Sequence, residues 1–109
     1  MAYDELLAQR IREIVAQIPG FTEKRMFGGV GYMLSGNMAC GVNGSDVILR
    51  VGPERYEEVL ALPESKPFDM TGRPMRGWVT VSAEDVLDDT KLEHWVRQAT
   101  ELALTLPPK

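Results

Sequence analysis

The stretch from Glu23 to Val51 constrains the fold most, because glycines recur through it and helical periodicity is absent. Glycines stand at positions 28, 29, 31, 36, 41 and 44. Short apolar runs lie between them, such as Tyr32-Met33-Leu34 and Val47-Ile48-Leu49, and such runs are typical of strands. Ser35-Gly36-Asn37 and Asn43-Gly44-Ser45 are turn clusters. The segment therefore predicts an antiparallel meander with two tight hairpins.

Amphipathic helices are predicted on both sides of this meander. Apolar residues recur every three or four positions at the start of the chain, which predicts a helix over about residues 3–18 that Pro19-Gly20 ends. A longer stripe near the other end predicts a closing helix over about residues 90–105, with Asp88-Asp89-Thr90 offering its N-cap. The two stripes include Leu7, Ile11, Ile14, Trp95, Val96 and Leu102.

The middle of the chain predicts a short helix over about residues 53–61 and a loop with two prolines over residues 62–67. Phe68–Met70 and Met75–Val81 are expected to pair as a further hairpin, followed by a helical turn over residues 83–87. This order favours an α+β fold of two layers, with an antiparallel sheet of about five or six short strands packed against the N- and C-terminal helices. The expected inner face of the sheet comprises Phe27, Tyr32, Leu34, Val47, Leu49, Val79 and Val81.

Length and charge narrow the classes of function. A chain of 109 residues is expected to form a single domain over residues 1–109. No apolar run approaches the roughly 20 residues that span a bilayer, and no signal-peptide pattern stands at the start. The formal net charge is −4 and no segment is strongly basic, so direct nucleic-acid binding is not expected. Cys40 is the only cysteine and cannot form an internal disulfide, which favours the cytoplasm.

The residue types that carry chemistry do not form a recognisable reactive set. His94 is the only histidine and lies beside an apolar stripe, while Cys40 lies within a small apolar run. The acidic residues between Glu84 and Asp89 lack calcium-loop spacing and suit the N-terminus of a helix instead. We therefore expect no catalytic residue, no cofactor and no metal site, and we expect a non-enzymatic protein.

Two other features carry functional hypotheses. Arg73, Arg76 and Trp78 gather at a turn and on the strand that leaves it, and these residue types anchor protein interfaces. They form the predicted partner surface, with Arg76 and Trp78 expected on one face of the strand because side chains alternate. The alternative hypothesis is a small-ligand or nucleotide-binding domain that uses the glycine-rich segment Gly28–Gly31. Its G-G-x-G spacing differs from the dinucleotide fingerprint. Homodimerisation through an exposed sheet edge is a further possibility.

The segment Arg25-Met26-Phe27-Gly28-Gly29-Val30-Gly31-Tyr32, with Gly36-Asn37-Met38 after it, resembles the signature of the TfoX/Sxy N-terminal domain family. Val47–Val51 looks like the strand that follows in that family. Leu87-Asp88-Asp89, followed by Leu92, Trp95, Val96 and Ala99, is similar to its C-terminal pattern. The likeness covers about residues 4–104.

The resemblance implies a two-layer α+β domain similar in arrangement to secretion chaperones. It also implies a link to the regulation of competence genes, in which larger relatives act as co-activators with a transcription factor of the cyclic-AMP receptor type. The chain ends at Lys109, so a stand-alone, single-domain form is expected. The family supplies no catalytic residues to transfer. We therefore expect a cytoplasmic protein-interaction module, accessory to transcription, whose partner is a transcription factor or a component of RNA polymerase.

Overall fold

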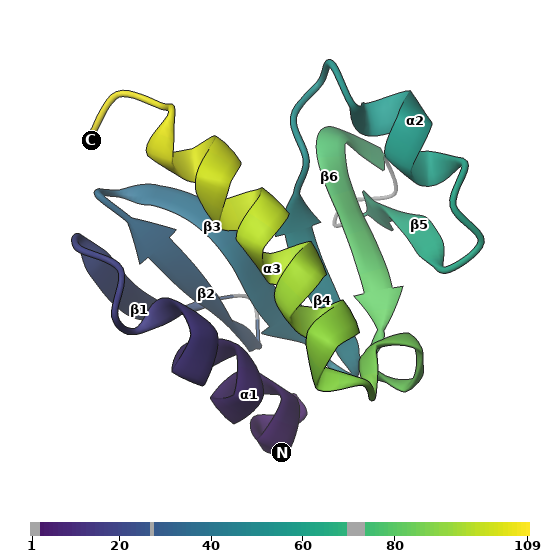
Figure 1. The fold of residues 1–109 in the computed structure, drawn as a ribbon, viewed down its shortest axis with the longest axis horizontal. Coiled ribbons are helices and arrows are strands. Elements are labelled where there is room, and N and C mark those ends of the chain that lie inside the picture. The colour runs from purple at the N-terminus through teal and green to yellow at the C-terminus, as the bar shows by residue number, and fades with distance from the viewer. Residues whose placement is uncertain (1–2, 27, 70–73) are drawn as a thin grey trace.

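A six-stranded antiparallel sheet with helices against one face makes up the fold (Figure 1). A computed structural model describes residues 3–26, 28–69 and 74–109. In chain order the elements are α1 (Glu5–Val15), β1 (Phe21–Met26), β2 (Gly29–Leu34), β3 (Asn37–Asn43), β4 (Asp46–Arg50), α2 (Tyr56–Leu60), β5 (Ser65–Asp69), β6 (Pro74–Ser82), the 3-10 helix η1 (Ala83–Val86) and α3 (Asp89–Leu104). The predicted α+β class and two-layer arrangement are confirmed.

The strands lie in the order β1-β2-β3-β4-β6-β5, and all neighbours are antiparallel. The first four strands form the predicted meander, with tight hairpins between β2 and β3 and between β3 and β4. β5 and β6 form the predicted third hairpin. It joins the sheet through β6, which pairs with β4, so that β5 becomes an edge strand.

The inner face of the sheet and the helices enclose the core. Paired residues on neighbouring strands point to the same side, so Tyr32, Cys40, Leu49 and Val79 form one row across four strands. All four are buried, and Leu7, Ile11, Trp95 and Val96 cover them from α1 and α3. The predicted core is thus confirmed for the described residues, with Ile14 and Leu102 half-buried at its margin. Phe27 lies outside those residues.

Side-chain caps set where the two long helices begin. The Asp4 carboxylate accepts a hydrogen bond from Leu7 N at 3.0 Å, and the Asp88 carboxylate accepts from Thr90 N at 2.8 Å. Helix α1 begins later than predicted because Tyr3 forms a bridge with Gly44 of the β3–β4 turn instead of entering the helix, and it ends at Val15, before the predicted end at residue 18. Within the described ranges, no helix is long and apolar enough to cross a membrane.

The prediction that residues 62–67 form a loop is wrong over its second half. β5 begins at Ser65 and includes Pro67. Proline lacks an N–H donor and is therefore tolerated mainly in edge strands, where one side of the strand has no neighbour to accept a bond. β5 lies at the edge because β6 pairs with β4 on its other side, and the local sequence does not display that pairing.

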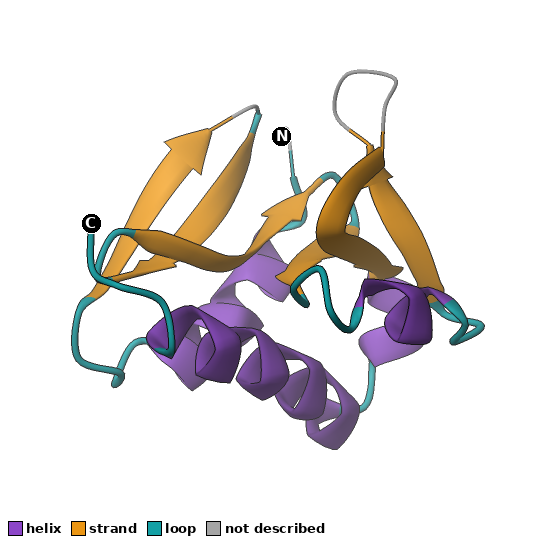
Figure 2. Cartoon of the chain, turned by 90° about the horizontal axis from the view of Figure 1, so that it is seen from above, coloured by secondary structure: helices purple, strands orange, loops and turns teal. Residues whose placement is uncertain are grey.

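The sheet is bent, and its two edge pairs β1–β2 and β5–β6 stand up on either side of β3 and β4, away from the helices (Figure 2). Glycines allow β2 and β3 to approach closely at the centre. A Cβ atom on Gly41 would lie 2.5 Å from the carbonyl oxygen of Val30, and one on Gly29 would collide with the carbonyl oxygen of Val42. The backbone of the sheet is thus curved, with its concave side turned away from the helices (Figure 2).

Arg10 on α1 ties the two long helices together. Its Nη2 donates to the carbonyl oxygens of Val86 and Leu87 at 2.8 and 3.2 Å and contacts the Asp89 carboxylate at 2.9 Å. We expect Arg10→Met to lower the free energy of unfolding by about 1–2 kcal/mol, because it leaves carbonyl groups near the start of α3 unpaired. Urea denaturation measures the loss. Arg97→Met is the matched control, since Arg97 forms only an exposed pair with Glu93 on α3 and should cost about 0.5 kcal/mol or less.

Burial of Cys40 predicts a particular loss of stability in alkali. Desolvation raises the pKa of its thiol from 9.0 to about 12, so the folded state keeps the neutral thiol while the unfolded state ionises first. The contribution of the neutral thiol to the free energy of unfolding is complete below pH 9, and it falls as the pH rises from there toward about 12. Cys40→Ala should be less stable than wild type at pH 7 because it leaves a cavity. By pH 10.5 the difference in free energy of unfolding between the two proteins, which we call the gap, should shrink by about 2 kcal/mol, because only the wild type has the thiol. A gap in urea denaturation that stays constant with pH would contradict this assignment.

Candidate functional site

The face of the sheet that carries no helices presents a row of apolar and cationic side chains. Met33 pairs with Met38, and Arg50 pairs with Trp78, so these residues share the side opposite the core row. Ile48 also lies on this face and is 5% exposed, yet it is not part of the core cluster. We call this side the open face. The backbone of the sheet curves toward this side (Figure 2).

Arg50, Trp78 and Phe68 form the centre of the open face, on β4, β6 and β5. The guanidinium carbon of Arg50 lies 5.2 Å from the centroid of the Trp78 ring, which is cation–π distance. The ring of Phe68 lies 6.5 Å from that of Trp78 at an interplanar angle of 52°. Arg50 Nη1 also donates to the carbonyl oxygen of Met38 at 3.3 Å. A half-buried indole is thus held between a cation and a second aromatic ring.

A hollow of about 600 Å³ adjoins this centre. It extends from Phe68 toward the β3–β4 turn. Two aspartates and a lysine line it, together with apolar surface. Its lining comprises Asn43, Asp46, Lys66, Pro67, Phe68, Asp69 and Thr80. The open face therefore combines recessed shape, aromatic surface and charge, which are the properties of an interaction surface.

The structure describes two of the three residues predicted for the partner surface. Trp78 is half-buried on the open face and Arg76 is exposed, whereas Arg73 lies outside the described residues. Gly77 between them has φ +94°, and the register of β5 and β6 shifts here, so simple alternation does not govern which way Arg76 points. Sequence reasoning missed Arg50 and Phe68, because both meet Trp78 through pairing between strands.

The glycine-rich segment does not have the geometry of a phosphate-binding loop. Gly29 to Gly31 lie inside β2, paired with β1 on one side and β3 on the other, and Gly29 and Gly31 are buried. A phosphate site of that kind needs exposed N–H groups at the start of a helix. The close approach of β2 and β3 accounts for Gly29, and the segment lies within the sheet, so the geometry does not favour the alternative of nucleotide binding there.

The remaining candidate groups are separate from one another. Cys40 is fully buried and its raised pKa keeps the thiol protonated. His94 is exposed on α3 and shares a hydrogen bond of 2.8 Å with Gln98. Asp88 caps α3, and Asp89 pairs with Arg10. Within residues 3–26, 28–69 and 74–109, no group of three or more histidine, cysteine, aspartate or glutamate side chains could hold a metal ion.

Comparisons with known proteins place this fold. The chain resembles the crystal structure of Deinococcus radiodurans protein DR2400, which carries a DUF419 domain, with a TM-score of 0.65 and 22% sequence identity over 84% of this chain and 74% of that one. At this identity the likeness concerns the fold alone. No curated protein matches the chain. The family described as the TfoX N-terminal domain matches residues 13–103, and the chain therefore belongs to the TfoX N-terminal domain family.

Proposed function

We propose that this domain is a cytoplasmic, non-enzymatic protein-interaction module that binds its partner through the open face of the sheet. The observation that carries the proposal is the position of Trp78. The indole is half-buried, outside the core cluster and on the side of the sheet that α1 and α3 leave uncovered. A large aromatic side chain that contributes little to the core but lies in a concave surface is typical of an interface anchor.

The cations nearest Trp78, as distinct from the two aspartates that line the hollow beyond Phe68, indicate the chemistry of the partner. Arg50 lies over the ring, and Lys66 and Arg76 are exposed on the neighbouring strands. An arginine held against an aromatic ring keeps donors available for a carboxylate, and its planar group recognises that anion well. The partner segment we propose presents an acidic side chain beside an apolar one. The apolar group would enter the hollow next to Phe68.

The family suggests which proteins to test first. Membership of the TfoX N-terminal domain family supports a role as an accessory regulator of transcription, including that of competence-type genes. A transcription factor or a component of RNA polymerase is therefore the proposed partner. The net charge of −4 favours contact with such a protein over direct contact with DNA.

Reversing the charge at the centre of the open face should abolish partner binding. Arg50→Glu places a carboxylate over the Trp78 ring and repels the acidic segment that we propose, so we expect capture of the partner to fall at least about tenfold. Quantitative affinity capture from the native host, followed by titration with the purified partner, measures the change. Trp78→Ala should weaken the same purified complex by about 2 kcal/mol.

Arg97→Glu is the matched control, because it reverses an exposed arginine on the helix side of the sheet. It should leave capture unchanged, and circular dichroism should show that both charge-reversal variants are folded. If Arg50→Glu and Trp78→Ala retain the partner at the wild-type affinity, the open face is not the interface. If DNA competes with the partner and binds with steep salt dependence, the proposed protein contact is wrong.

A further inference from the structure

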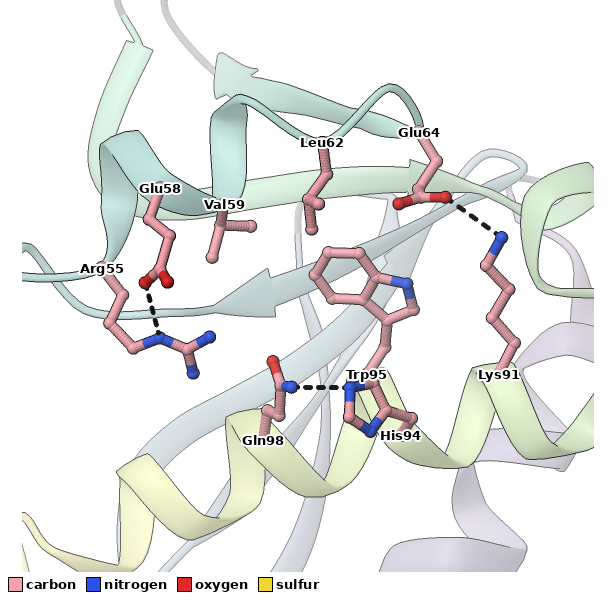
Figure 3. Close-up of a pocket in the computed structure, with 9 residues that line it drawn as sticks. All are labelled: Arg55, Glu58, Val59, Leu62, Glu64, Lys91, His94, Trp95 and Gln98. Carbon is pink, nitrogen blue, oxygen red and sulfur yellow. Dashed lines mark hydrogen bonds and ion pairs between the residues drawn. The ribbon is translucent and has the colours of Figure 1, made fainter.

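A second recess lies on the helix side of the sheet, between α2 and α3, and has a volume of about 380 Å³ (Figure 3). Its floor is apolar. Trp95 projects from α3 toward Val59 and Leu62, and the three side chains enclose the centre of the groove (Figure 3). Val59 and Trp95 are 1% and 5% exposed, so they are largely fixed by the core. A recess of this size with an apolar floor suits a small molecule.

The charged side chains at the rim neutralise one another in pairs. Arg55 pairs with Glu58 at 3.4 Å on α2, and Lys91 on α3 pairs with Glu64 at 3.0 Å. Each cation therefore already has a carboxylate of its own. A charged ligand that takes the place of one of these partly exposed pairs gains little, because the ion it engages already has a partner. A charged ligand that leaves both pairs intact places its own charge unpaired against the apolar floor, which is costly. The rim favours an uncharged ligand.

The Trp95 indole provides the polar contact within the groove. Its N–H is on the side of the ring toward the Glu64–Lys91 pair, and Figure 3 draws no hydrogen bond from it. No hydrogen bond joins it to a described residue, and among the described residues only the Ser65 hydroxyl is both fully buried and unpaired, so this N–H reaches the solvent of the groove. Indole nitrogen is a donor only, so its natural partner is a neutral acceptor such as a carbonyl oxygen. The largely buried side chain of Trp95 thus directs a donor that no described residue uses toward the Glu64–Lys91 side of the recess, at the edge of its apolar floor.

We propose that this groove binds an uncharged small molecule that has an apolar body and a carbonyl oxygen, as in an aliphatic amide. The carbonyl oxygen accepts a hydrogen bond from Trp95 Nε1, and the apolar body packs on Val59 and Leu62. The site lies on the opposite side of the sheet from the open face and shares no lining residue with its aromatic centre. Its test needs no protein partner, and the failure of either proposal leaves the other standing.

Nuclear magnetic resonance of the indole N–H groups tests the proposal directly. The chain has two tryptophans, and the spectrum of Trp78→Phe assigns the Trp95 signal. Hexanamide, hexanoate and hexylamine are then titrated into the wild-type protein. We expect hexanamide to shift the Trp95 signal saturably at millimolar concentration and to leave the Trp78 signal in place. The two charged probes should bind at least about tenfold more weakly.

A pair of surface variants provides the control. Leu62 lines the groove and is 42% exposed, so Leu62→Lys should fold and abolish the shift caused by hexanamide. Leu104, which is 53% exposed near the end of α3 and outside the groove, receives the same change in Leu104→Lys and should keep the shift. The proposal is overturned if hexanamide gives no saturable shift, if hexanoate binds as tightly as hexanamide, or if Leu62→Lys retains the shift.

Discussion

The close approach of β2 and β3 is the constraint on which the rest of the structure depends. A side chain at Gly29 or Gly41 would meet the backbone of the neighbouring strand, so only glycine permits the two strands to pass at this spacing. The sheet bends around this centre. Its edge pairs curve away from α1 and α3, which pack on the inner face, and Ile48 on the opposite face is almost fully buried without any helix above it. β2 and β3 thus contribute side chains to both the core and the open face.

Local patterns in the sequence predicted most of the elements, because each pattern has a local physical cause. The apolar stripe and the Asp88 cap suffice to predict α3, and the turn clusters at Gly36 and Gly44 suffice to predict the meander. The start of β5 was missed because Pro67 argues against a strand unless the strand is known to lie at an edge. Its edge position comes from the pairing of β6 with β4, which no local pattern contains.

The candidate sites were harder to predict for the same reason. Trp78 was identified by its residue type, but Arg50 lies 28 positions earlier in the numbering and reaches the ring only through the pairing of β4 with β6. The groove between α2 and α3 is built around Trp95, and the apolar stripe of the closing helix predicts that Trp95 is a core residue. That assignment was correct for the ring, which is almost fully buried. The free N–H at its edge becomes visible only when α2 is placed across from α3.

The two surfaces share one structural element, although they lie on opposite sides of the sheet. Glu64, immediately before β5, pairs with Lys91 at the rim of the groove, while Phe68 near the other end of β5 packs beside Trp78 on the open face. β5 is an edge strand with a single neighbour, and the buried hydroxyl of Ser65 at its start has no hydrogen-bond partner among the described residues. An unpaired buried hydroxyl costs free energy, so β5 is held less firmly than the central strands. A displacement of this strand would therefore change the rim of the groove and the aromatic centre of the open face together.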